Sequence, residues 1–110
     1  AGDGLRHCRI RPGQPDPLQS LIELFLKDAR SRLDKMTAAM EHSDAAAMIS
    51  NAHTLKGSAR NLGAAHLGRL CADLEKTVKI GGMGEAATIL LEMRGAFEHV
   101  QQALLAELQK

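Results

Sequence analysis

The sequence contains no tryptophan or tyrosine, and Phe25 and Phe97 are its only phenylalanines. Strands favour aromatic and β-branched side chains, so this shortage argues against a sheet. Positive and negative charges nearly balance at a net charge of +1, which gives no argument for a nucleic-acid partner or for membrane contact by this domain. The chain also lacks an apolar run approaching the roughly 18 residues that a membrane-spanning helix needs. These absences favour a small all-α domain.

Cysteine is scarce, because only Cys8 and Cys71 are present. They form neither a disulfide framework nor a CxxC pair, and we expect a reducing, cytoplasmic location. Residues 1–16 carry three glycines and two prolines and have no hydrophobic period, so we expect a linker or a cloning remnant there. The chain begins at Ala1 rather than at methionine, and we therefore expect a fragment of a longer protein.

Residues 17–110 instead show apolar side chains at spacings of three and four, which is typical of amphipathic helices. Isolated amphipathic helices are marginal in water, so the apolar stripes must pack on one another. The sequence therefore predicts an all-α, antiparallel four-helix bundle with up-down-up-down topology over residues 17–110. The four stripes are Leu18, Ile22, Phe25, Ala29, Leu33, Met36 and Met40; Met48, Ala52, Leu55, Ala59 and Leu62; Leu67, Leu70, Cys71, Leu74 and Val78; and Ile89, Leu90, Met93, Phe97, Val100, Leu104 and Leu108.

Turn and capping residues separate the stripes. Asp16 followed by Pro17 predicts the first helix start, with a capping side chain before a proline at the first helical position. In "HSD", Ser43 is the candidate N-cap of the second helix, and Gly63 permits a turn after it. "GGMG" at 81–84 matches neither the P-loop nor the dinucleotide-binding motif, so we interpret it as an interhelical turn.

The second predicted helix carries His53 on the side away from its apolar stripe. At about 100° per residue, His53 lies about 140° from Met48. Lys56 and Gly57 follow three and four residues later and share the face of His53. A helical glycine costs on the order of 1 kcal/mol relative to alanine, so Gly57 either keeps this surface open or permits close helix packing. A neutral imidazole is a nucleophile, and a nearby lysine would offset the charge of an added phosphoryl group. An ordinary solvated helix face is the alternative interpretation.

"AHTLKGSARNLG" at 52–63 resembles the motif of histidine-containing phosphotransfer (HPt) domains, approximately A-H-x-L-K-G-[SA]-[SA]-x-x-x-G, at every position. "LGRLCADLEK" at 67–76 resembles the third helix of the same family. The resemblance extends over roughly residues 17–108 of the chain and implies a phosphorelay intermediate without a nucleotide site of its own, rather than an enzyme.

The resemblance also implies roles for individual residues. His53 would be the phosphoacceptor, through Nε2, and Lys56 would contact the phosphoryl group. Gly57 would keep the docking face open. Glu75 matches the position of a third-helix Gln or Glu that approaches the histidine in the family, where a carboxylate could accept the Nδ1 proton and leave Nε2 free. An ordinary charged helix residue is the alternative for Glu75.

Two further residues are candidates for partner binding. Ile49 lies one turn before His53 and could form an apolar docking patch with Leu18, Leu21 or Ile22, or could belong partly to the core. Arg60 could contribute to the same docking surface, or could be a solvated arginine.

By analogy with the family, an aspartyl phosphate on a response-regulator receiver domain would donate to His53, and a second receiver aspartate would accept from it. The receiver would supply Mg²⁺, and we expect no cofactor or metal in this chain. A hybrid sensor histidine kinase is an expected partner, and the domain could be the cytoplasmic C-terminal part of such a membrane-bound kinase. Four helices in one chain remove the need for a second copy, so we expect a monomer.

Three other functions are alternatives to this one. The dimerisation region of a sensor kinase also carries a helical phosphohistidine, but an acidic residue and then a proline typically follow it, whereas Thr54 follows here. A metal- or haem-binding bundle lacks support, because no histidines pair at i,i+4. A helical adaptor without phosphate chemistry stays open, although the intact His53, Lys56 and Gly57 count against it. Cys71 lies on an apolar stripe and is interpreted as core.

Overall fold

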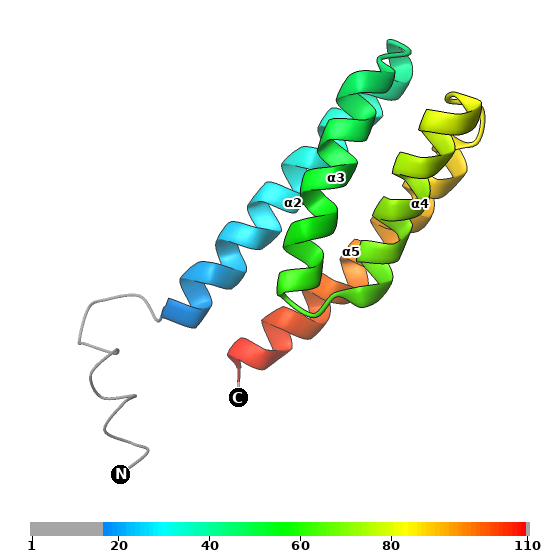
Figure 1. Ribbon diagram of the computed structural model, residues 1–110. Helices are drawn as coiled ribbons and strands as arrows, with labels where there is room; N and C mark the ends of the chain where they lie inside the picture. The colour runs from blue at the N-terminus through cyan, green and yellow to red at the C-terminus, as the bar shows by residue number, and fades with distance from the viewer. Residues whose placement is uncertain (1–16, 110) are drawn as a thin grey trace.

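The computed structural model describes residues 17–109, and these residues form four α-helices joined by short turns (Figure 1). The predicted linker at 1–16, with the predicted cap Asp16 and with Cys8, lies outside them. No strand occurs in residues 17–109. The helices are α2 (Pro17–Glu41), α3 (Ala45–Asn61), α4 (Ala65–Gly81) and α5 (Ala86–Leu108).

Successive helices run antiparallel and enclose a single core. Each helix packs against the next one along the chain, and α5 returns to pack against α2. As a result, the start of α2 and the end of α5 lie at the same end of the bundle (Figure 1). The predicted up-down-up-down four-helix bundle is confirmed.

The core is made mostly of residues from the predicted apolar stripes, together with Leu26, Ala39, Ala86 and Ala96, which the predicted stripes did not include. The described residues include no buried polar or charged residue, so burial of apolar surface is the main favourable contribution. Short alanine side chains at several core positions let the helices approach closely. The buried residues are Ile22, Phe25, Leu26, Ala29, Leu33, Met36, Ala39, Met48, Ala52, Leu55, Ala59, Leu67, Leu70, Cys71, Leu74, Val78, Ala86, Leu90, Met93, Ala96 and Phe97.

The stripes are less well buried near the ends of the bundle. Leu18 is 49% exposed, so its assignment to the core was wrong. It lies in the first turn of α2, at the end of the bundle, where fewer helices surround it. Several other predicted stripe residues are only half-buried, namely Met40, Leu62, Ile89, Val100, Leu104 and Leu108.

The turn between α2 and α3 corrects the predicted cap. Asp44, not Ser43, is the N-cap of α3, and its side chain accepts a hydrogen bond from the Ala47 backbone N–H at 3.1 Å. Ser43 has a φ of 55°, and Asp44 N donates to Ala39 O at 2.7 Å. Ser43 is therefore the left-handed residue that ends α2, and it cannot also cap α3.

The ends of α3 and α4 confirm the turns predicted at glycines. Gly63 has a φ of 77°, and Gly82, in the "GGMG" turn, has a φ of 79°. These are left-handed conformations that glycine adopts without a steric penalty. The backbone N–H of Ala64 donates to Ala59 O at 2.8 Å across the first of these turns.

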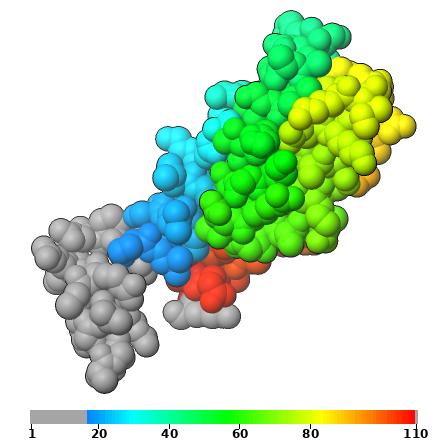
Figure 2. Space-filling view, in the orientation of Figure 1, coloured from blue at the N-terminus to red at the C-terminus, as the bar shows by residue number. Residues whose placement is uncertain are grey.

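The helix that carries His53 occupies a central place on one face of the molecule. In Figure 2, α3 runs along the middle of the visible face, with α2 on one side and α4 on the other. Outward-pointing side chains of α3 are therefore flanked by residues of two other helices. None of the helices in the described part of the chain is long and apolar enough to cross a membrane.

Candidate functional site

His53 projects from the exposed surface of α3, as its angular position predicted. Its side chain is 67% exposed, whereas Ala52 and Leu55, on the same helix, are fully buried. The imidazole can therefore meet another molecule without any rearrangement of the core.

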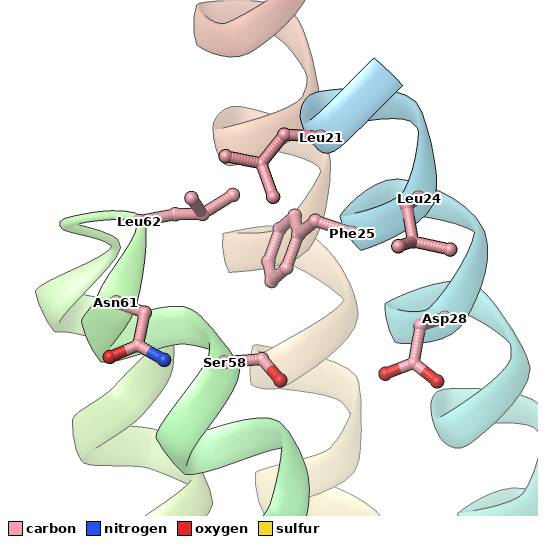
Figure 3. Close-up of a pocket in the computed structure, with 7 residues that line it drawn as sticks. All are labelled: Leu21, Leu24, Phe25, Asp28, Ser58, Asn61 and Leu62. Carbon is pink, nitrogen blue, oxygen red and sulfur yellow. The ribbon is translucent and has the colours of Figure 1, made fainter. Parts of the chain in front are cut away.

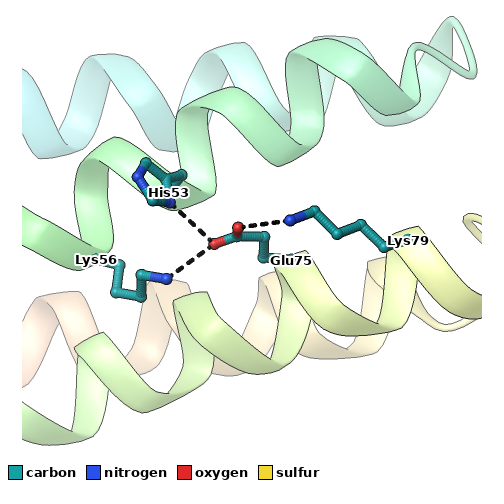
Figure 4. Close-up of polar contacts among 4 residues, drawn as sticks. All are labelled: His53, Lys56, Glu75 and Lys79. Atoms are coloured by element: carbon teal, nitrogen blue, oxygen red, sulfur yellow. Dashed lines mark hydrogen bonds and ion pairs between the residues drawn. The ribbon is translucent and has the colours of Figure 1, made fainter.

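A carboxylate from the neighbouring helix faces this imidazole. Glu75, on α4, places Oε1 at 3.4 Å from Nδ1 of His53 and at 3.1 Å from Nζ of Lys56 (Figure 4). The other oxygen, Oε2, lies 3.0 Å from Nζ of Lys79. Only 12% of the Glu75 side chain is exposed. His53, Lys56 and Glu75, which are predicted site residues, are thus brought together, and Lys79 joins them.

The two lysines keep Glu75 ionised. Hydrogen bonds from Lys79 and Lys56 lower the pKa of the Glu75 carboxyl from 4.5 to about 2. An ionised carboxylate can only accept hydrogen bonds, so it favours a proton on the ring nitrogen that faces it. In a neutral His53 that nitrogen is Nδ1, which leaves the lone pair on Nε2.

The lowered pKa predicts how Glu75 affects stability as a function of pH. The folded protein binds this proton less tightly than the unfolded chain, so the stabilisation is fully present above about pH 4.5 and is lost as pH falls towards about 2. We expect the difference in free energy of unfolding between the wild type and Glu75→Gln to be constant near neutral pH and to shrink across this window. Chemical denaturation at a series of pH values measures it. A difference that did not change with pH would contradict the ion pairs.

Gly57 leaves open space beside His53. A Cβ built at Gly57 would have no heavy atom of another part of the molecule within 4 Å, so close helix packing does not account for this glycine. Its position one turn after His53 keeps the adjoining surface free of side chains. By contrast, a Cβ at Gly68 on α4 would lie 3.3 Å from Cγ of Arg60. Gly68 is thus the close-packed glycine, and sequence reasoning did not identify it.

The two residues predicted for partner binding lie outside the Glu75 cluster. Ile49 is half-buried and packs against the core. Arg60 is an exposed residue whose side chain extends over Gly68, with Nε 3.7 Å from where a Cβ would be. Their roles in docking stay predictions.

An apolar groove lies between α2 and the end of α3 (Figure 3). It has a volume of about 330 Å³ and is lined by Leu21, Leu24, Phe25, Asp28, Ser58, Asn61 and Leu62. Leu21 is 51% exposed and Leu24 is 66% exposed. The wall from α3 begins at Ser58, directly after Gly57, and Asn61 follows Gly57 by four residues, so Asn61 and Gly57 share a helix face.

The groove differs from the apolar patch that the sequence suggested around Ile49. Ile22 is buried in the core, and Ile49 precedes Ser58, the groove residue of α3 nearest to it, by nine positions, or about 14 Å along the helix axis. Leu21 therefore belongs to a surface separate from Ile49. Leu24 was missed, although a leucine off the apolar stripe of its helix was a signal in the sequence.

Lys79 was also missed. Its signal was its position four residues after Glu75, a spacing at which side chains of opposite charge meet on one helix. Cys71 is buried as predicted, and burial raises the pKa of its thiol from 9.0 to about 12. Among the described residues, no group of three or more His, Cys, Asp or Glu side chains is arranged to hold a metal ion.

Comparisons with known proteins agree with this geometry. A protein-family model described as the Hpt domain matches residues 20–108. The chain is also similar to the crystal structure of histidine-containing phosphotransfer protein B (HptB) from Pseudomonas aeruginosa PAO1. The two are 31% identical with a TM-score of 0.79, over 82% of this chain and 78% of that chain. A comparison with curated proteins gave no match. With its four-helix bundle and its exposed histidine, the chain belongs to the Hpt domain family, whose members are histidine phosphotransfer carriers rather than kinases.

Proposed function

We propose that Nε2 of His53 accepts a phosphoryl group from an aspartyl phosphate on one receiver domain and passes it to an aspartate on another. The observation that carries this proposal is the exposed imidazole whose Nδ1 lies 3.4 Å from the ionised Glu75. That pairing directs the lone pair of the neutral ring to Nε2, the nitrogen that an in-line transfer needs.

Bonds, charge and protons are all accounted for in the proposed transfer step. The P–O bond to the donor aspartate breaks as the P–Nε2 bond forms, and the aspartate leaves as a carboxylate. Because Nδ1 keeps its proton, the phosphorylated ring carries a positive charge that faces Oε1 of Glu75. The return reaction onto the second aspartate reverses these bond changes, so this chain needs no net proton transfer.

Lys56 is proposed to stabilise the added phosphoryl group. Its Nζ now donates to Oε1 of Glu75 at 3.1 Å, and an ammonium group has three N–H donors. Lys56 lies three residues after His53, on the same helix face, so it can turn towards an anion on the ring. The receiver domain is proposed to supply Mg²⁺ and most of the charge stabilisation of the transferring group.

Docking of a receiver is proposed to use the open surface at Gly57 and the groove between α2 and α3. Leu21 and Leu24 offer exposed apolar area there, while Asp28 and Asn61 provide polar groups at its rim. An apolar centre with a polar rim is typical of protein interfaces. Ile49 and Arg60 are proposed as contacts elsewhere on the face around His53.

The wider setting is proposed from the family. We infer a cytoplasmic carrier that works as a monomer, with a hybrid sensor histidine kinase as one source of phosphoryl groups. Support for a monomer comes from the four helices of one chain, which complete a shared core.

The proposal is tested by direct phosphoryl transfer. Receiver domains from the source organism are loaded with radiolabelled phosphate, and each is mixed with the purified chain. We expect acid-labile, alkali-stable label on the chain, with one receiver donating much faster than the others. A second, unlabelled receiver should then remove the label. A folded chain that takes no label from any receiver would contradict the proposal and favour a helical adaptor without phosphate chemistry.

A further inference from the structure

The two oxygens of Glu75 have different partners. Oε1 is shared by Nδ1 of His53 and Nζ of Lys56, both on α3, whereas Oε2 pairs with Lys79 on α4 (Figure 4). The function proposed above gives Lys79 no role.

The contact with Lys79 is local to α4. Lys79 follows Glu75 by four residues on the same helix, so this contact does not depend on what α3 binds. A carboxylate held by one oxygen can still turn about its last side-chain bond. A lysine on each oxygen restricts this rotation, and Oε1 faces His53 and Lys56 on α3.

Phosphorylation of His53 would change the ion pairs of Glu75. The phosphoryl group would bring negative charge within reach of Lys56, which would then be attracted away from Glu75. If Lys79 were absent, the Glu75 carboxylate would then keep the imidazole as its only cationic neighbour. Lys79 is the second lysine that pairs with Glu75. It stays clear of the reacting group, because its side chain is on the far side of Glu75 from His53 (Figure 4).

We propose that Lys79 is a positioning residue, which holds Oε2 of Glu75 so that Oε1 stays directed at Nδ1 of His53 when Lys56 turns to the phosphoryl group. This inference rests on the proposed function of His53. It extends that function to a residue that touches neither the imidazole nor the transferred group.

Lys79→Met tests the proposal, because it removes the charge and keeps a side chain of similar length. Lys79→Arg is the conservative variant that should restore the contact. Lys76→Met is the matched control, since Lys76 is an exposed lysine on the same helix and no ion pair to Glu75 is formed by it. The Lys79 side chain is 56% exposed, so all three variants should fold, and helical circular dichroism checks this.

The first readout is the tautomer of His53 in the unphosphorylated protein. Imidazole ¹⁵N chemical shifts, measured at about pH 8, above the ordinary imidazole pKa near 6.5, report which nitrogen carries the proton. We expect Lys79→Met to lower the fraction of the Nδ1–H form, and we expect Lys79→Arg and Lys76→Met to resemble the wild type.

The second readout is labelling of His53 by phosphoramidate, a small donor that needs no docking surface. We expect Lys79→Met to slow labelling about two- to fivefold, the usual size of a contribution from an exposed ion pair. An unchanged tautomer and rate in Lys79→Met would overturn the proposal. Equal losses in Lys79→Met and Lys76→Met would also overturn it, because they would indicate a general effect of positive charge.

The two readouts separate this proposal from the function on which it rests. A wild type that takes no phosphoryl group from phosphoramidate or from any receiver would contradict the phosphotransfer function. The tautomer measurement would still decide whether Lys79 orients Glu75 towards His53.

Discussion

His53→Gln is expected to reduce phosphoryl acceptance to the background level, from receivers and from phosphoramidate alike. Glutamine has no nucleophilic nitrogen, so no other group at this position can form the bond to phosphorus. The fold should persist, because the His53 side chain is 67% exposed and is not part of the core. Incorporation of label measures the first effect, and thermal unfolding followed by circular dichroism measures the second.

His66→Gln and His99→Gln are the matched controls for this experiment. Both histidines are exposed, and each control makes the same chemical change at another site. They should accept label at the wild-type rate. Label that persisted on His53→Gln would mean that another histidine is the acceptor. A large loss of helicity in His53→Gln would contradict its exposed placement.

Gly57→Glu is expected to slow transfer from a receiver by at least about tenfold. The new side chain would project beside His53, where a Cβ now meets nothing within 4 Å, and would obstruct a docked partner. Its carboxylate would also lie near the phosphoryl group, and like charges brought together at an interface cost several kcal/mol. Because about 1.4 kcal/mol corresponds to a tenfold change in rate, this cost exceeds what a tenfold loss requires. Single-turnover transfer from a labelled receiver measures the effect.

Two other substitutions at Gly57 separate charge from size. Gly57→Gln adds the bulk without the charge, so it should slow transfer less than Gly57→Glu does. Gly57→Ala fits the open space and replaces a helical glycine, so it should raise the free energy of unfolding by about 1 kcal/mol. Equal transfer rates for glutamate, glutamine and glycine at this position would show that receivers dock elsewhere.

Much of the fold was predictable because helical periodicity is a local property. A turn of about 100° per residue determines which side chains share a face. This rule alone assigns Met48 and Leu55 to the core and His53 to the exposed face. Gly63 marked a turn because a left-handed residue there is costly for other amino acids.

Which of two neighbouring residues becomes a helix N-cap was less predictable. Ser43 and Asp44 are both good capping residues, and the sequence does not say which one adopts the left-handed conformation. The structure shows that Ser43 ends α2 and that Asp44 caps α3. Hydrogen bonds of the turn as a whole decide between them.

Helical periodicity in the sequence predicts the four amphipathic helices, most of the buried residues and an exposed histidine followed by a lysine and a glycine. Packing of the helices brings Glu75 to His53 and leaves its second oxygen to Lys79, and the contact with His53 does not follow from periodicity. Packing also places the apolar groove at Leu21 and Leu62 rather than at Ile49. Periodicity fixes the face of each helix, whereas the rotation and axial position of neighbouring helices come from packing of the whole core.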